Sequence, residues 1–307
     1  MKEDKKLLIV GGTGFIGRHL ALKAVNNGYK TSVVSLNQVG RYQRIKNVEY
    51  HNADITNYED LRAILKDKNY THVVNLGGYI SHVLYKAGGR NIIEAHFTGL
   101  KNLVELLNWD SLESFVQIGS SDEYGNLSAP QREDMREEPI SSYSLGKLAA
   151  SQFLQMLYRT EKFPAVILRL FLVYGPEQDK QRFLPQIITG CLNGATFATS
   201  HGQQLRDFCY IDDITRGILL ALKCSNANGE VINLASGTPV AIYDVVEKIQ
   251  GIISKGTPLF GEVPYRDGEN MALYADTSKA KSILNWEYQV QMDEGISQTI
   301  KYYNDEN

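Results

Sequence analysis

Short apolar runs alternate with longer segments of mixed polarity through the first half of the chain. Between the runs, apolar residues recur at helical spacing, as Ile16, Leu20 and Ala24 do. The runs have the length of buried strands: Leu7–Val10, Thr31–Leu36, His72–Leu76, Phe115–Ile118 and Ala165–Leu170. Strands that alternate with helices predict an α/β fold, in which a doubly wound parallel sheet is covered by helices on both faces.

The pattern becomes irregular after Leu170, where prolines and glycines are more frequent. Two later segments, Phe208–Leu222 and Val231–Leu234, again have the character of a helix and a strand that return to the main sheet. Two domains are predicted from this change: a larger one over residues 1–170 and 210–236, and a smaller one over residues 171–209 and 237–307.

The composition excludes several classes of protein. The 307 residues carry 32 Lys and Arg against 35 Asp and Glu, so no basic excess favours nucleic acid as a partner. The run at Leu7–Val10 is too short for a secretion signal or a membrane span, and we expect a cytoplasmic protein without a membrane partner. Three cysteines and six histidines lack the spacing of a disulfide framework or a metal site, so no metal is expected. The acidic segment Glu133–Glu138 is most simply a solvated loop.

The first apolar run leads directly into a glycine-rich turn, Gly11-Gly12-Thr13-Gly14-Phe15-Ile16-Gly17, and an amphipathic segment follows. In a strand–turn–helix unit, Gly11 permits the tight turn, and Gly14 lets backbone N–H groups approach a pyrophosphate at the start of the helix. Gly17 allows the helix to pack closely against the strand. A tight turn without a ligand is the alternative, but the position in the first βα unit favours a dinucleotide-binding Rossmann domain.

A carboxylate about 20 residues beyond the glycines normally binds the adenosine 2′-hydroxyl of NAD. Here the second predicted strand ends in Ser35-Leu36-Asn37, and Arg41, Arg44 and Lys46 follow. Because a hydroxyl and guanidinium groups suit a 2′-phosphate, NADP(H) is the predicted cofactor, with NAD(H) as the alternative. Asp54 is expected either to contact the adenine or to start the next helix. Further cofactor contacts are expected at Thr13, Phe15, Ile16, Ser35, Asn37, Arg41, Ile55, Leu76 and Gly77.

Tyr143 and Lys147 lie four residues apart, on the same face of a predicted helix. A phenol with a reference pKa of about 10 is a poor acid–base group at neutral pH, but an adjacent ammonium favours its ionised form. The pair is therefore a candidate for proton exchange with a substrate. A surface Tyr and Lys on an ordinary helix are the alternative.

With these motifs the chain resembles the extended short-chain dehydrogenase/reductase family of nucleotide-sugar epimerases, dehydratases and reductases. The resemblance covers nearly the whole chain. It rests on the glycine turn, Gly119–Gly125 (GSSDEYG), the Tyr143/Lys147 pair, Arg169–Pro176 (RLFLVYGP), Arg206–Asp213 (RDFCYIDD), Asn233–Gly237 (NLASG), and Asp276–Ala280 before Leu284-Asn285-Trp286.

The resemblance implies that Ser120 is the catalytic hydroxyl that bonds to the reacting sugar oxygen. Tyr143 would exchange the proton, and Lys147 would hold the nicotinamide ribose and lower the pKa of the tyrosine. Ser121 would contact the substrate. Asp122 lies where dehydratases have a Glu and is a possible acid–base group.

The resemblance also implies a nucleotide-diphosphate sugar as the partner and a homodimer as the assembly. Arg206 and Arg266 occupy the places of arginines that grip the diphosphate, although each could instead be a surface salt-bridge partner. The chain departs from the family pattern at several positions, and two of these departures bear on the site. His96 replaces an Asn and is interpreted as a core histidine bonded to the backbone, and Leu172 replaces an Asn that often contacts the diphosphate.

Three reactions are open to such a site: 4-epimerisation, 4,6-dehydration and reduction of a keto sugar. The missing acid after the second strand favours NADPH-dependent reduction of a 4-keto-6-deoxy nucleotide sugar at C4, as in deoxysugar or surface-polysaccharide biosynthesis. A 4-epimerase or a 4,6-dehydratase is the alternative. A non-catalytic NADP-binding sensor is a remote third hypothesis, because such proteins typically lack the Tyr–Lys pair.

Overall fold

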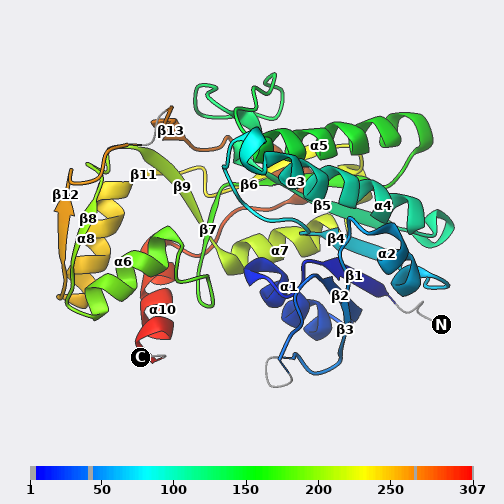
Figure 1. Ribbon diagram of the computed structural model, residues 1–307, viewed down its shortest axis with the longest axis horizontal. Helices are drawn as coiled ribbons and strands as arrows, with labels where there is room; N and C mark the ends of the chain where they lie inside the picture. Colours follow the sequence, from blue (N-terminus) through cyan, green and yellow to red (C-terminus); the bar gives the residue numbers. More distant parts are fainter. Residues whose placement is uncertain (1–4, 41–43, 266–267, 306–307) are drawn as a thin grey trace.

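A parallel sheet of seven strands forms the centre of the larger half of the molecule (Figure 1). The computed structural model describes residues 5–40, 44–265 and 268–305. In spatial order the strands are β10 (Val231–Leu234), β6 (Ala165–Leu170), β5 (Ser114–Ser120), β4 (His72–Asn75), β1 (Lys6–Val10), β2 (Lys30–Ser35) and β3 (Val48–Asn52). Every neighbouring pair is parallel, which confirms the predicted α/β class. The carboxyl ends of these strands therefore meet at one edge of the sheet.

The apolar pattern does not predict strand β3. This strand lies at the edge of the sheet, pairs with β2 alone, and has no buried residue. Its sequence, Val-Glu-Tyr-His-Asn, accordingly lacks an apolar run. The predicted helix over Phe208–Leu222 begins later than expected, because strand β9 (Leu205–Tyr210) ends before helix α7 (Ile211–Ala221) starts.

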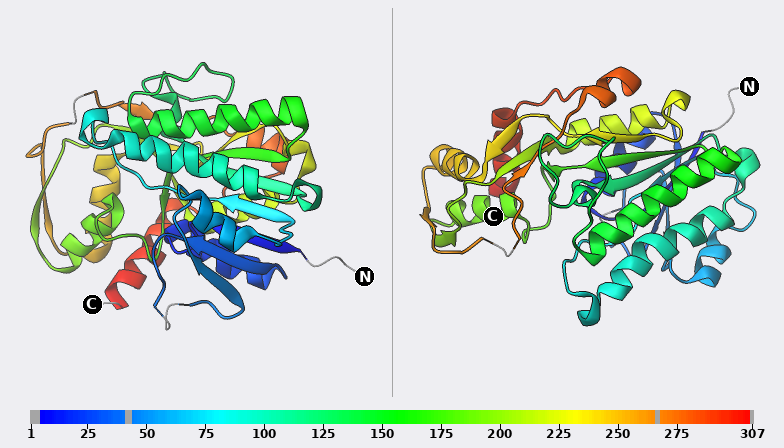
Figure 2. Two further views of the ribbon diagram at one scale, coloured as in Figure 1. Left: turned by 45° about the vertical axis from the view of Figure 1, so that its right-hand side comes forward. Right: turned by 90° about the horizontal axis from the view of Figure 1, so that it is seen from above.

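Helices cover both faces of the sheet, as Figure 2 shows. Along β1, Leu8 and Val10 face one apolar core, whereas Leu7 and Ile9 face the other. Helices α2 (Tyr58–Leu65), α4 (Gly99–Leu106) and α5 (Ser142–Glu161) pack on the first face, and α1 (Phe15–Asn26), α7 and α9 (Ser278–Leu284) pack on the second. A short helix, α3 (Gly89–Ile93), runs into α4 through a π-helical turn. Within the described ranges, no helix is long and apolar enough to cross a membrane.

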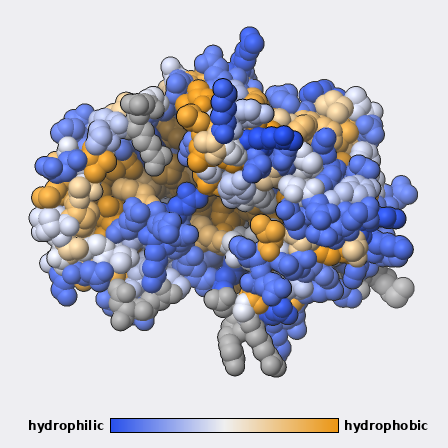
Figure 3. Space-filling model, in the orientation of Figure 1, coloured by the Kyte–Doolittle hydropathy of each residue, from blue (hydrophilic) through white to orange (hydrophobic). Residues whose placement is uncertain are grey.

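The smaller half has its own strands and its own apolar core. Strand β9 pairs with β7 (Leu172–Tyr174), β11 (Pro239–Ala241) and β13 (Ala272–Leu273), and β8 (Thr196–Thr199) pairs with β12 (Thr257–Phe260). The helices of this half are α6 (Phe183–Leu192), α8 (Ile242–Ile253) and α10 (Met292–Asp305). Figure 3 shows that the surface is hollowed between the two halves.

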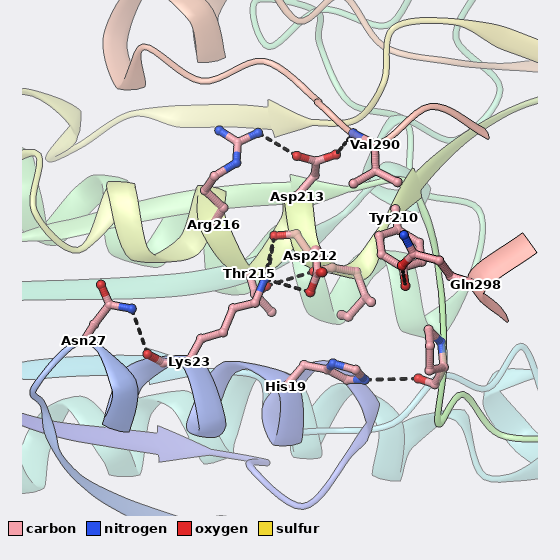
Figure 4. A network of polar contacts seen from close by, with 12 residues as sticks. His19, Lys23, Asn27, Tyr210, Asp212, Asp213, Thr215, Arg216, Val290 and Gln298 are labelled. Atoms are coloured by element: carbon pink, nitrogen blue, oxygen red, sulfur yellow. Dashed lines mark hydrogen bonds and ion pairs between the residues drawn. The ribbon is translucent and has the colours of Figure 1, made fainter. Parts of the chain in front are cut away.

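Polar contacts of helix α7 connect it to α1 and to the C-terminal segment (Figure 4). Lys23 on α1 pairs with Asp212 at 2.7 Å. Asp213 is buried, and its carboxylate accepts hydrogen bonds from the backbone N–H groups of Gln289 and Val290 and pairs with Arg216. Asp212 and Asp213 are thus adjacent in the sequence, but Asp212 forms a partly exposed ion pair, whereas Asp213 belongs to a buried network of polar contacts.

We expect Asp213→Ala to destabilise the fold by about 3 kcal/mol, because two backbone donors and the Arg216 guanidinium lose their partner. Asp212→Ala is the matched control. Its carboxylate is half-exposed, so loss of the Lys23 pair should cost about 1 kcal/mol or less. Urea denaturation of both variants measures the difference, and equal losses would contradict this account of Asp213.

Candidate active site

The three residues predicted to be catalytic meet where strand β5 ends and helix α5 begins. Ser120 is the last residue of β5, and its side chain lies close enough to that of Tyr143, in the first turn of α5, to lower the pKa of the phenol. The Lys147 ammonium donates to the carbonyl of Ile118 at 2.8 Å and lies 5.9 Å from the centre of the Tyr143 ring. Helix α5 starts here because Ser141 caps it, with reciprocal bonds between Ser141 and Ser144.

Burial controls the proton affinity of both groups. Burial raises the pKa of the Tyr143 phenol well above its ordinary value, against the Ser120 side chain and the charge of Arg182, which lower it. Burial also lowers the pKa of Lys147 to about 8, although Glu123 and Asp122 act in the opposite direction. The phenol is therefore a proton donor until a further positive charge comes close to it.

His96 forms a wall of this site as an uncharged side chain. Its Nε2 is 3.0 Å from the carbonyl oxygen of Tyr79, and its ring meets the Tyr143 ring edge-on at 5.1 Å. Burial, together with the positive charge of Lys147, lowers the pKa of His96 to about 3. The structure thus places His96 as a buried histidine bonded to the backbone, as the sequence indicates.

The glycine turn leaves a cradle that side chains would fill. Gly11 has φ +76°, and a Cβ on it would lie 2.9 Å from the carbonyl oxygen of Leu76. A Cβ on Gly17 would lie 2.5 Å from the carbonyl oxygen of Gly11. Helix α1 begins after Gly14 with no side-chain cap, so its first N–H groups are available to an anion. These features fit the pyrophosphate of a dinucleotide.

Ser35 closes this cradle at the end of β2. Its hydroxyl accepts a hydrogen bond from the backbone N–H of Thr13 at 3.2 Å. Asn37 beyond it is exposed, the Arg44 guanidinium lies over the Tyr50 ring, and Arg41 is outside the described residues. Of the residues predicted here to bind the adenosine 2′-position, Ser35 is therefore the one that the structure shows bonded to the glycine turn, among the residues it describes.

The remaining predicted cofactor residues flank the same edge of the sheet. Asp54 accepts hydrogen bonds from the Thr56 N–H and hydroxyl at 2.8 Å each, in a turn just before α2. Ile55 lies so close to Gly77 that a Cβ on the glycine would be 2.7 Å from its Cδ1. Leu76 continues β4, with its N–H bonded to the carbonyl of Val10; Phe15 and Ile16 are the first two residues of α1.

On the substrate side, the structure places the predicted residues in different settings. Ser121 is buried at the start of the turn after β5, and the Asp122 carboxylate is 3.7 Å from Nε2 of His82. Arg206 is buried and ion-paired with Glu269, so it is not a surface residue. Arg266 lies outside the described residues.

The interpretation of Glu133–Glu138 as a solvated loop is wrong for Glu133 and Glu137, whereas Asp134 and Glu138 are exposed as expected. Glu137 forms an ion pair with the buried Arg169, and Glu133 accepts a hydrogen bond from the backbone N–H of Asn233 at 2.8 Å. A buried guanidinium requires a carboxylate, and this loop supplies one. The acidic run is partly an internal feature.

Sequence reasoning also missed Glu123, Arg169 and Ser151, which form a buried polar cluster behind Ser120. One signal was available for Ser151, because it follows Lys147 by four residues and so lies on the face of Tyr143 and Lys147. Among the described residues, no group of His, Cys, Asp and Glu side chains could hold a metal ion.

Comparison with known proteins identifies the group of enzymes that share this arrangement. The family model described as the NAD dependent epimerase/dehydratase family matches residues 7–235. The chain belongs to this family. UDP-glucuronate 4-epimerase of Thermodesulfobacterium geofontis is 27% identical over 316 residues, covering 96% of this chain and 95% of that protein.

Solved structures of the family have the same fold. UDP-glucose 4-epimerase of Thermotoga maritima, with UDP-glucose, is 25% identical with a TM-score of 0.91, covering 98% of this chain and 99% of that one. UDP-glucuronic acid 4-epimerase of Bacillus cereus, in complex with UDP-glucuronic acid and NAD, is 28% identical with a TM-score of 0.85, covering 98% and 100%. The family and the Rossmann-type fold expected from the sequence are thus confirmed.

The uncharged state of His96 predicts a specific loss of stability in acid. An unfolded chain binds a proton at His96 below pH 6.5, whereas the folded protein does so only near pH 3, so stability falls as pH decreases between these values. At pH 5 the loss is about 2 kcal/mol. His96→Asn removes this contribution, and its urea-denaturation free energy should depend less on pH than that of the native protein.

His72, whose pKa burial lowers to about 4, is present in both proteins and gives the same background. Parallel pH profiles for the native protein and His96→Asn between pH 6.5 and 5 would contradict the assignment.

Proposed function

We propose that the chain is a nucleotide-diphosphate-sugar 4-epimerase that uses a retained NAD(P) cofactor. The observation that carries this proposal is the contact of Ser120, Tyr143 and Lys147 beside the glycine cradle. The relatives support it, because those described above are 4-epimerases that act on UDP-sugars. In this respect 4-epimerisation is better supported than the keto-sugar reduction that the sequence favours.

Each residue of the cluster has a distinct role in the proposal. The Ser120 hydroxyl holds the sugar 4-oxygen next to the Tyr143 phenol, which takes up and returns the hydroxyl proton. Lys147 binds the nicotinamide ribose, and its charge favours the ionised phenol. When bound, the nicotinamide supplies the acceptance and return of the C4 hydride. Ser121 completes the contact with the sugar.

Binding is divided between the two halves. We assign the cofactor to residues 1–170 and 210–236, with the pyrophosphate at Gly11, Gly14 and Gly17, and the nucleotide sugar to residues 171–209 and 237–307. Arg206 would bind the substrate diphosphate after release from Glu269. The homodimer and the cytoplasmic location expected from the sequence stay predictions.

Reduction of a 4-keto-6-deoxy nucleotide sugar with NADPH is the second candidate. It is favoured by Ser35, which stands where NAD-binding proteins have a carboxylate, and by Leu172 in place of a diphosphate-binding Asn. A non-catalytic sensor is disfavoured, since Ser120, Tyr143 and Lys147, the residues proposed to be catalytic, lie together. NAD in the Bacillus cereus epimerase supports NAD at least as well as NADP for this chain.

A product assay separates these reactions. We expect the purified protein to convert UDP-glucose or UDP-glucuronic acid to its 4-epimer with no net change in NAD(P)H, as followed by NMR and nicotinamide absorbance. Asp122→Asn should retain most of this activity, because epimerisation removes no proton from C5. Mass spectrometry of the denatured protein identifies the retained cofactor.

Two outcomes would overturn the proposal. Stoichiometric oxidation of NADPH by a 4-keto-6-deoxy nucleotide sugar, without epimerisation, would establish the reductase. A 4-keto-6-deoxy product from a 4-hydroxy substrate, with a loss of about 10²-fold or more in Asp122→Asn, would establish a dehydratase.

The phenol hydroxyl of Tyr143 is expected to serve the chemical step and not cofactor binding. Tyr143→Phe should therefore lower kcat by about 10²–10⁴-fold and leave the Kd of the cofactor within about twofold. Tyr158→Phe on the same helix is the matched control and should have native activity. A Tyr143→Phe variant with native kcat would remove this residue from the mechanism.

A further inference from the structure

A carboxylate without any exposed surface lies directly behind the catalytic cluster. Oε1 of Glu123 accepts a hydrogen bond from the backbone N–H of Ser120 at 2.9 Å. Its Oε2 accepts from the Ser151 hydroxyl at 2.8 Å and from Nε of Arg169 at 3.0 Å. One side chain therefore joins the end of β5, helix α5 and strand β6.

The local sequence makes room for this arrangement. A Cβ on Gly119 would lie 2.6 Å from Oε1 of Glu123, so a larger residue there would require the carboxylate to shift from its position at Ser120. Ser151 follows Lys147 by one helical turn, and its hydroxyl is also 3.1 Å from the carbonyl oxygen of Lys147. The carboxylate thus contacts the strand that carries Ser120 and the helix that carries Tyr143 and Lys147.

We propose that Glu123 is a positioning residue for the reaction: it fixes the Ser120 hydroxyl relative to Tyr143 and places a negative charge against the face of α5 that carries Lys147. The inference rests on the proposed function in that Ser120, Tyr143 and Lys147 do the chemistry. Glu123 itself is fully buried, so it has no exposed atom that could contact a bound cofactor or substrate.

The charge balance around the cluster supports the electrostatic part. Arg169 pairs with both Glu123 and Glu137, so one guanidinium serves two carboxylates and a net negative charge remains. The charged groups that influence Lys147 are Glu123 and Asp122, on the turn after β5, and both raise its pKa against the effect of burial. The other titratable neighbours, His96 and Tyr143, are uncharged at neutral pH because burial disfavours their ionised forms.

Two substitutions separate the effect of the length of the Glu123 side chain from the effect of its charge. Glu123→Asp keeps the charge but shortens the side chain by one methylene, so the carboxylate cannot bond to both Ser120 and Ser151. We expect kcat to fall about 10- to 100-fold with KM for the nucleotide sugar unchanged, since displacing a reacting group by about 1 Å costs up to about 10²-fold. Glu123→Gln keeps the length and removes the charge, so Lys147 should lose its proton at a lower pH.

The control is Glu137→Gln, which removes the other carboxylate partner of Arg169 without touching Ser120 or Ser151. It matches Glu123→Gln in the loss of one charge from the Arg169 cluster. If Glu123 only stabilises the fold, both variants should lower Tm by similar amounts and leave kcat and its pH dependence unchanged. On the proposal, Glu123→Gln alone moves the alkaline limb of the kcat profile to lower pH.

NMR gives a readout that does not require turnover. Lysine labelled with ¹³C at Cε reports the titration of Lys147, assigned by its loss in Lys147→Met, and the ¹H shift of the Ser120 amide reports its hydrogen bond. We expect the Lys147 pKa to fall in Glu123→Gln and to stay near 8 in Glu123→Asp. The Ser120 amide should move upfield in Glu123→Asp.

The outcomes distinguish this inference from the proposed function. If no nucleotide sugar is turned over by the native protein but the Lys147 and Ser120 signals change as expected, the proposed function fails and the positioning role stands. An unchanged Lys147 pKa in Glu123→Gln would overturn the positioning role. Unchanged kcat together with an unchanged Ser120 amide shift in Glu123→Asp would also overturn it. Glu123→Asp keeps a negative charge beside Arg169, and it decides the geometric part even if Glu123→Gln does not fold.

Discussion

Burial of the Lys147 ammonium against the end of β5 is the interaction on which the rest of the site depends. An unpaired charge in such a position costs several kcal/mol, and the structure offsets this cost with the Ile118 carbonyl and with the negative charge of Glu123. The result is a lysine with a pKa of about 8, charged at neutral pH and held against the Tyr143 ring. A more exposed lysine would be solvated and would have less effect on the phenol.

The need to balance this buried charge involves residues well beyond helix α5. Glu123 is balanced by Arg169, and Arg169 in turn contacts Glu137 in the acidic loop and lies 4.5 Å from the centre of the Tyr124 ring. The Tyr124 hydroxyl donates to Asn233 on β10 at 2.7 Å. The active-site turn is therefore connected through buried polar contacts to the edge strand of the sheet, and the acidic loop belongs to this network.

Features that depend on residues close together in the sequence can be predicted from it, whereas contacts between residues far apart in the sequence cannot. The buried strands and the Tyr143–Lys147 pair follow from local patterns, since a strand needs an apolar run and a helix face needs a spacing of four. Edge strand β3 lacks such a run and was not predicted. Glu123 and Arg169 are 46 residues apart, and no local pattern indicates that they pair. The Arg206–Glu269 pair could not be predicted for the same reason, because the two residues are 63 positions apart in the sequence.

The position of Arg206 is set by its neighbour Asp207. The buried Asp207 carboxylate accepts hydrogen bonds from the backbone N–H groups of Ser236, Gly237 and Ala275, which follow β10 or precede α9. Because β10 belongs to the large sheet, these bonds fix Arg206 relative to the carboxyl end of β5. If Arg206 holds the substrate diphosphate, the distance from diphosphate to reacting sugar carbon is set by backbone hydrogen bonds, and Glu269 neutralises the guanidinium until an anion replaces it. On this assignment a sugar without a diphosphate could not compensate for the loss of that ion pair, and selection of a nucleotide sugar would begin with the charge of its phosphates.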